Sequence, residues 1–243
     1  MPGTFTPTGD KAGLTRSIEE CLKILDGTKK IDIFECGRKD PNVPIEETVG
    51  CLAEFVKAGK IGGIGLSEVA ATTIRRAAAV HLIAAVEVEF SMFSTDIQTN
   101  GVAATCNELG IPIVAYSPLG RGFLTGHIKS FEDVTDFQKM GPRFHEENFH
   151  KNMELVETIK QVAEKKGCTP AQLAIGWVKA HSATSGHPVI IPLPGATTVH
   201  RVQENMKDVE LTDDEIEEIR GILAAIPVQG PRVPKFLEHL AWG

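Results

Sequence analysis

Residues 113–126 read IVAYSPLGRGFLTG and contain the only tyrosine of the chain, Tyr116. The apolar run at 111–115 predicts a buried strand, and Pro118 and Gly120 predict a loop directly after it. In α/β proteins, ligands bind at the loops that follow the carboxyl ends of parallel strands. Glycines let a backbone come close to a ligand, and an arginine such as Arg121 can bind a phosphate. The segment therefore predicts a ligand-binding loop, with a plain glycine-rich turn as the alternative.

The rest of the chain alternates between short apolar runs and stretches of helical periodicity. Strands are expected at 31–36, 61–66, 83–90, 111–116 and 189–192. Helices are expected at 14–25, 44–58, 71–80, 95–109, 149–166, 169–181, 199–206 and 212–225. A long loop is expected at 117–148, and the tail at 227–243 has little periodicity. Each expected strand precedes a helix, which predicts parallel strands joined by right-handed crossovers.

This alternation predicts an α/β protein of the (β/α)8 TIM-barrel type rather than a doubly wound sheet, because no G-x-G-x-x-G motif opens a helix. Five strands are three short of eight, so we expect a truncated barrel of about five β/α units. Such a piece has two unprotected sheet edges and an uncovered inner face. A second copy of the chain could cover these edges, which predicts a concentration-dependent homo-oligomer.

Length and composition narrow the class of protein. The 243 residues allow one α/β domain or two small ones, and we expect a single domain over 1–243. The net charge of -7 argues against a nucleic-acid partner. No apolar run reaches membrane length, and no signal peptide is recognised, which predicts a cytoplasmic protein without membrane contact. Five widely spaced cysteines indicate reduced, buried thiols.

Two further segments could carry chemistry. Residues 192–205 read PLPGATTVHRVQEN, where a strand meets the start of a helix; the free N–H groups there, with Arg201, could bind an anion. A capped surface helix is the alternative. Glu87 and Glu89 share one strand face, and together with Glu35 they could form a glycosidase-like acid/base pair. Paired structural carboxylates are the favoured interpretation. The histidine spacing predicts no metal site.

Five ordered segments together resemble the aldo-keto reductases, in particular their fungal pyridoxal-reductase-like branch. They are residues 31–41, 62–69, 86–93, 115–126 and 192–205. The resemblance runs from about Gly9 nearly to the C-terminus. It implies an eight-stranded (β/α) barrel that binds NADPH in an extended form and passes a hydride to an aldehyde or ketone. Pyridoxal is the substrate that the branch implies.

The resemblance also implies roles for individual residues. Ser67 and Glu68 stand where the family holds the nicotinamide carboxamide, with help from Glu87, and Tyr116 would stack on the nicotinamide ring. The residues implied to hold the pyrophosphate are Ser117, Leu119, Gly120, Arg121 and Gly122. Those implied to hold the adenosine end and its 2′-phosphate are Thr197, Arg201, Glu204 and Asn205. The preference for NADPH over NADH then depends largely on Arg201.

This chain departs most from the family at the positions of the family's catalytic residues. The family takes an Asp, a Tyr and a Lys from its first three strand regions, and a His after the fourth strand. This chain matches the family from just after the third strand, and Gly37 stands at the histidine position. We therefore assign no catalytic residue, and we expect carbonyl reduction by this chain to be slow or lost. A non-catalytic NADP(H)-binding sensor or partner subunit is the alternative. A late-starting gene model would also explain the missing region.

Overall fold

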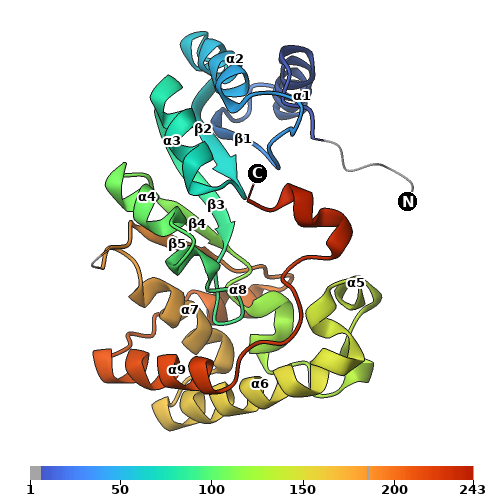
Figure 1. Ribbon diagram of the computed structural model, residues 1–243, viewed down its shortest axis with the longest axis vertical. Helices are drawn as coiled ribbons and strands as arrows, with labels where there is room; N and C mark the ends of the chain where they lie inside the picture. The colour runs from blue at the N-terminus through green and yellow to red at the C-terminus, as the bar shows by residue number, and fades with distance from the viewer. Residues whose placement is uncertain (1–6, 185, 243) are drawn as a thin grey trace.

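The computed structural model describes residues 7–184 and 186–242. Its strands form one parallel sheet in the order β1-β2-β3-β4-β5, so strands that are neighbours in sequence are neighbours in space (Figure 1). They are β1 (Ile31–Cys36), β2 (Ile61–Ser67), β3 (Ile83–Glu89), β4 (Ile113–Tyr116) and β5 (Ile190–Leu193). The parallel order confirms the expected β/α units. The single domain expected over 1–243 includes residues outside the described ranges.

Helices alternate with the strands, beginning with α1 before β1, and build a second layer. They are α1 (Lys11–Leu25), α2 (Ile45–Lys57), α3 (Ala71–Val80), α4 (Val102–Glu108), α5 (Asp136–Lys139), α6 (Glu146–Lys166), α7 (Pro170–Ala180), α8 (Val199–Asn205) and α9 (Asp213–Ala225). Short 3₁₀ helices are η1 (Asp96–Gln98), η2 (Gly120–Thr125), η3 (Phe131–Asp133), η4 (Pro142–Phe144) and η5 (Lys235–Leu240). The capping box at Thr212 and Glu215 begins α9, as its sequence predicts.

Two sequence expectations were wrong. The helix expected at 95–109 is split into η1 and α4, because Gly101 between them has a φ of 86° and interrupts the helical turn. The loop expected at 117–148 contains α5 and three 3₁₀ helices. Local capping stabilises these short turns: the Thr135 side chain accepts a hydrogen bond from the Gln138 amide, and the Gln138 side chain accepts one from the Thr135 amide.

The two faces of the sheet differ in burial. Figure 1 shows α2, α3 and α4 along one side of the strands and the C-terminal segment on the other. The side chains of Ile64, Val86 and Ile113 are fully buried on the helix-covered face. On the opposite face, Ile33 is 47% exposed and Ile191 is 50% exposed. This second face corresponds to the inside of a barrel, and it is only partly covered.

The sheet is open at both ends. Within residues 7–184 and 186–242, β1 pairs only with β2, and β5 pairs only with β4. The two free edges expected from a five-strand piece of a barrel are therefore present. Among these same residues, no helix has both the length and the apolar character needed to cross a membrane.

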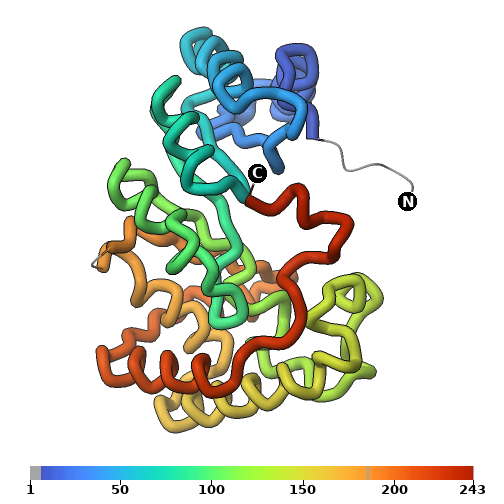
Figure 2. The backbone as a smooth tube through the Cα atoms, viewed as in Figure 1, coloured from blue at the N-terminus to red at the C-terminus, as the bar shows by residue number. Residues whose placement is uncertain are grey.

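The C-terminal segment (residues 227–242) returns to the sheet, although its sequence has little periodicity. Figure 2 shows it, in red, running from α9 along the molecule to the end where α1–α3 lie. Asn152 of α6 fixes the start of this path, since its side chain accepts from the Gln229 amide at 2.8 Å and donates to the Gln229 carbonyl at 3.0 Å. Leu240 is buried near its end. The segment is thus an ordered part of the fold.

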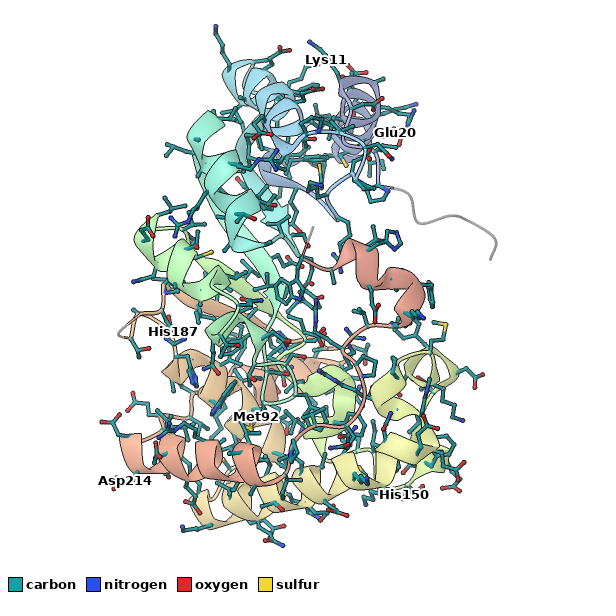
Figure 3. All side chains as sticks on the ribbon, in the orientation of Figure 1. Lys11, Glu20, Met92, His150, His187 and Asp214 are labelled. Atoms are coloured by element: carbon teal, nitrogen blue, oxygen red, sulfur yellow. The ribbon has the colours of Figure 1, made fainter. Side chains whose placement is uncertain are left out.

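Packed side chains fill the space between the sheet and the helices α6, α7 and α9, which lie in the lower part of Figure 1. Figure 3 shows Met92 among packed side chains in the interior, whereas Lys11 and Glu20 of α1 point outward. Met92 is only 2% exposed. The core therefore lies on the helix side of the sheet and continues under the segment that follows β4, which holds that segment in place.

Candidate functional site

The carboxyl ends of β2, β3 and β4 bring three polar residues together. Glu68 follows β2 directly and has a φ of 53°, an uncommon conformation for glutamate. Glu89 and Tyr116 end β3 and β4, and they are partners in the sheet register. The Glu68 amide donates to the Glu87 carbonyl at 2.9 Å, which ties this turn to the neighbouring strand. Parallel strand ends thus place these side chains at one edge of the sheet.

Glu68 is buried and uses both carboxylate oxygens. Its Oε1 accepts from the Tyr116 hydroxyl and from the Glu89 amide, each at 3.0 Å. Its Oε2 accepts from Arg232 Nη2 at 2.6 Å. Burial by itself raises the pKa of Glu68, but the Arg232 guanidinium and the other hydrogen bonds outweigh it, so the pKa lies below its usual range. Glu68 is therefore an ionised anchor inside the protein.

Glu89 is 1% exposed and pairs with two arginines. Arg121 binds it with both Nη2, at 2.7 Å, and Nε, at 3.1 Å, while Arg232 Nη1 lies 3.3 Å from Oε2. Glu68, Glu89, Arg121 and Arg232 therefore form one network, which we call the arginine–glutamate cluster. Its ion pairs agree with the favoured interpretation of Glu89 as a structural carboxylate.

Tyr116 is held by this cluster. Its hydroxyl donates to Glu68, and its side chain is half-buried. Burial, followed by the charges of Glu68 and Glu89, raises the pKa of Tyr116 above its usual value. The phenol is thus fixed in direction and gives up its proton less readily than an ordinary tyrosine.

The loop after β4 has an unusual backbone. Ser117, Gly120, Arg121 and Gly122 all have positive φ values, of 52°, 58°, 56° and 110°. A Cβ atom on Gly120 would lie 3.2 Å from the Phe93 ring, and one on Gly122 would lie 2.9 Å from the side-chain nitrogen (Nε2) of Gln138. The φ of Gly122 strongly favours glycine, and at Gly120 a side chain would crowd the Phe93 ring. Leu119 is buried beneath the same loop.

Packing and hydrogen bonds therefore support the backbone of the predicted ligand loop. Gln138 adds to this by donating to the Arg121 carbonyl at 2.9 Å. The Arg121 side chain remains 34% exposed while it pairs with Glu89. Its guanidinium can therefore reach solvent, or a bound anion, without leaving the cluster.

The adenosine-end residues expected from sequence lie together at α8. Arg201 Nη1 donates to the Thr197 hydroxyl at 3.2 Å, and both residues are exposed. Glu204 and Asn205 are half-buried on the same helix. A cavity of about 280 Å³ adjoins them, and its lining includes Pro192, Pro194, Ala196, Val202, Asn205 and Met206. Within the described part of the chain, no hydrogen bond joins these four residues to the arginine–glutamate cluster.

A larger cavity of about 670 Å³ lies at the carboxyl end of β1. Its lining includes Glu35, Cys36, Arg38, Glu68, Leu237 and Leu240, so the C-terminal segment forms one wall. Arg38 donates to the buried Ser67 hydroxyl at 3.2 Å.

Burial raises the pKa of Cys36 to about 11, which suits a packed thiol rather than a reactive one. Burial raises the pKa of Glu87 above its usual value, although the positive charge of Arg38 opposes this shift.

Sequence reasoning missed Arg38 and Arg232. Arg38 follows the end of β1, so the rule that strand ends carry functional residues could have found it. Arg232 lies in the aperiodic tail, where no pattern in the sequence indicates that it is buried.

Glu35 should titrate near neutrality. Burial and the neighbouring Glu87 carboxylate raise its pKa from 4.5 to about 7. An acid whose pKa is raised by folding contributes stability below pH 4.5 and loses that contribution as the pH rises through about 7. We therefore expect wild type to lose stability relative to Glu35→Gln between about pH 4.5 and about pH 7 in urea unfolding. A ¹³C NMR midpoint for the Glu35 carboxyl at or below 4.5 would contradict this.

Comparisons with known proteins identify related sequences. The family model described as "Aldo/keto reductase family" matches residues 1–224. A protein of Schizosaccharomyces pombe named "Probable pyridoxal reductase 2" is 40% identical over 243 residues, covering 97% of this chain and 72% of that protein. "Aldo-keto reductase str7" of Strobilurus tenacellus is 40% identical over 236 residues, covering 94% of this chain and 69% of that protein.

Solved structures show the same fold. A glycerol dehydrogenase of Gluconobacter oxydans superposes with a TM-score of 0.79 at 25% identity, covering 92% of this chain and 67% of that one. A thermostable aldo-keto reductase superposes with a TM-score of 0.66 at 24% identity, covering 88% and 67% of the two chains. This chain therefore belongs to the aldo/keto reductase family of oxidoreductases, which use NADP(H) to reduce carbonyl groups.

Proposed function

We propose that this chain binds NADPH across the carboxyl ends of its strands and that its carbonyl substrate is an aldehyde related to pyridoxal. The name of the Schizosaccharomyces pombe relative supports the substrate class, because that protein is 40% identical and is covered to 72% of its length. NADPH would supply the hydride. The residues of this chain would bind the cofactor, orient its nicotinamide and exclude water.

One observation carries the proposal: groups suited to the three parts of the cofactor lie in order along neighbouring strand ends. Tyr116 offers a fixed, half-buried aromatic ring at the end of β4. The glycine loop that follows presents the partly exposed Arg121 guanidinium. Since Tyr116 pairs with Leu193 of β5, the next site along is the segment with Thr197, Arg201 and the cavity beside Asn205. An extended dinucleotide fits this order.

The residues near the nicotinamide divide their work. We propose that Ser67 and Glu87 face the carboxamide, while Arg38 orients the Ser67 hydroxyl. A direct carboxamide contact for Glu68 stays a prediction. Its three donors, from Tyr116, Glu89 and Arg232, support a further role, which is to hold the Tyr116 ring in place. Ser117, Leu119, Gly120, Arg121 and Gly122 would hold the pyrophosphate, and Glu204 with Asn205 the adenine.

Carbonyl reduction also needs a proton, and Tyr116 is poorly suited to give it. Its hydroxyl already donates to Glu68, and its pKa is raised. Positioned proton transfer contributes about 10²–10⁴-fold to such reactions, so we expect slow turnover by this chain. This observation favours a second candidate function, an NADP(H)-binding subunit that does not itself catalyse. Pyridoxal-dependent NADPH oxidation at a rate typical of reductases, about 1 s⁻¹ or more, would contradict slow turnover.

NADPH binding should depend mainly on the ring of Tyr116, and to a smaller extent on the hydroxyl that fixes the ring. Stacking of a base on an aromatic side chain is worth about 1–3 kcal/mol, so Tyr116→Ala should weaken NADPH binding by about tenfold or more. Tyr116→Phe keeps the ring but loses the hydrogen bond to Glu68, so it should bind NADPH with an affinity between those of wild type and Tyr116→Ala. NADPH fluorescence titration measures both variants. Equal binding by wild type and Tyr116→Ala would remove Tyr116 from the site, and a folded wild type that binds no NADPH would overturn the proposed function.

Two further features belong to this proposal. A homo-oligomer that covers the free edges of β1 and β5 is supported by the half-exposed Ile33, Ile191 and Leu193. It predicts an apparent mass that rises with protein concentration. A cytoplasmic location is supported by five cysteines that are all free thiols.

A further inference from the structure

The C-terminal segment carries one arginine into the interior. The Arg232 side chain is 7% exposed. Gly230, two residues earlier, has a φ of 87°, and a Cβ atom there would lie 2.7 Å from the side-chain nitrogen (Nδ2) of Asn148. The guanidinium carbon of Arg232 lies over the Trp242 ring, 4.6 Å from the ring centroid. The segment is therefore shaped to deliver this guanidinium to the strand ends.

The guanidinium joins two carboxylates that serve different parts of the proposed cofactor site. Nη2 binds Glu68 at 2.6 Å, and Glu68 in turn accepts from the Tyr116 hydroxyl at 3.0 Å. Nη1 lies 3.3 Å from Glu89, which holds Arg121 through two hydrogen bonds. One residue thus connects the tyrosine proposed for the nicotinamide to the arginine proposed for the pyrophosphate.

The charges of the cluster explain why this connection matters. Within the described residues, Arg232 is the only cation that forms an ion pair with Glu68. Without it, a carboxylate that is 1% exposed would keep two neutral hydrogen-bond donors but no cation, so its buried charge would favour a movement of the group or the uptake of a proton. Either change weakens the acceptor that now fixes the Tyr116 hydroxyl. Glu89 would also lose one of its two cations.

We propose that Arg232 is a positioning residue for the cofactor site, which couples the docked C-terminal segment to the placement of Tyr116 and Arg121. This inference rests on the proposed function, because it concerns the site at which NADPH would bind. Coupling of this kind is reciprocal, so bound NADPH also stabilises the docked segment. The adenosine end of the cofactor, held at α8, lies outside this coupling.

The first experiment compares two nucleotides on one set of variants. We expect Arg232→Met to weaken NADPH binding by about tenfold, within the range of about 5–150-fold typical of coupled sites. Adenosine 2′,5′-bisphosphate lacks the nicotinamide and one of the two pyrophosphate phosphates, so its affinity, measured by calorimetry, should fall by less than that of NADPH. Arg232→Lys restores the charge without the two-armed geometry and should bind NADPH with an intermediate affinity. Arg220→Met is the matched control, since Arg220 pairs with Glu217 on the surface, and it should change neither affinity.

The outcomes separate this inference from the proposed function. NADPH binding by Arg232→Met at wild-type strength overturns the inference alone. Equal weakening of both nucleotides also overturns it, because that result indicates a general structural role. A folded wild type that binds neither nucleotide overturns the proposed function, and the inference fails with it.

A second measurement uses only the wild-type chain and does not depend on the folding of a variant. Lys235 lies in the C-terminal segment and is exposed, so trypsin can cleave after it. We expect saturating NADPH to slow this cleavage by about fivefold or more, and adenosine 2′,5′-bisphosphate to slow it less. Cleavage at the same rate with and without NADPH would contradict the coupling.

Discussion

Glu89→Gln is expected to lower the free energy of unfolding by about 3 kcal/mol, the lower end of the range for removing one partner of a buried ion pair. Glu89 is 1% exposed and receives three hydrogen bonds from Arg121 and Arg232. The amide of glutamine keeps the shape of the side chain but loses the charge that both guanidiniums need. Arg232 then keeps only Glu68 as a partner. Arg121 is 34% exposed and can turn toward water, which limits the loss.

Urea unfolding followed by circular dichroism measures this loss. The matched control is Glu217→Gln, which removes the same charge from an ion pair on the surface with Arg220. Both side chains of that pair are mostly exposed, so its removal should leave the unfolding midpoint unchanged. If Glu89→Gln and Glu217→Gln unfold at the same urea concentration as wild type, the arginine–glutamate cluster does not stabilise the fold.

Much of the sheet could be predicted, because each strand is short, apolar and followed by a helix. The sequence also predicted that Tyr116 ends one strand and that Glu89 lies on another, and the sheet register pairs the two residues. Glu87 and Glu89 could not be told apart in this way. They share one strand face, yet Glu89 is buried with two arginines and Glu87 is half-buried beside Glu35. The difference comes from the tertiary partners of each carboxylate, which a local pattern does not contain.

The cluster depends on contacts between distant parts of the chain. Arg232 and Glu68 are 164 residues apart, and the segment that carries Arg232 has no helical or strand periodicity. Arg121 could be identified as a functional arginine from its glycine-rich loop. Its partner Glu89 lies 32 residues earlier, and only the folded sheet brings the two together. Local patterns thus predicted the elements and the loop, whereas the charge network required the tertiary structure.

Phe123→Ala is expected to lower the free energy of unfolding by about 3–5 kcal/mol, because it removes a fully buried ring and leaves a cavity. Phe123 is 0% exposed, and its ring centroid lies 4.2 Å from that of Phe144 and 4.8 Å from that of Phe93. Both pairs are stacked, with interplanar angles of 14° and 9°. Phe137→Ala is the matched control, since that ring is 80% exposed, and it should unfold at the same urea concentration as wild type.

The same substitution tests what holds the proposed pyrophosphate loop. Phe123 follows Gly122 directly, so its ring anchors the residues whose positive φ values shape the loop. Loss of the anchor should let Arg121 leave Glu89, and we expect NADPH affinity to fall together with stability. Phe123→Leu keeps more apolar surface and should lose less of both. If Phe123→Ala is destabilised but binds NADPH as wild type does, then the glycine backbone and Gln138 are sufficient to hold the loop. If it is not destabilised at all, the aromatic stack adds no net stability at this position.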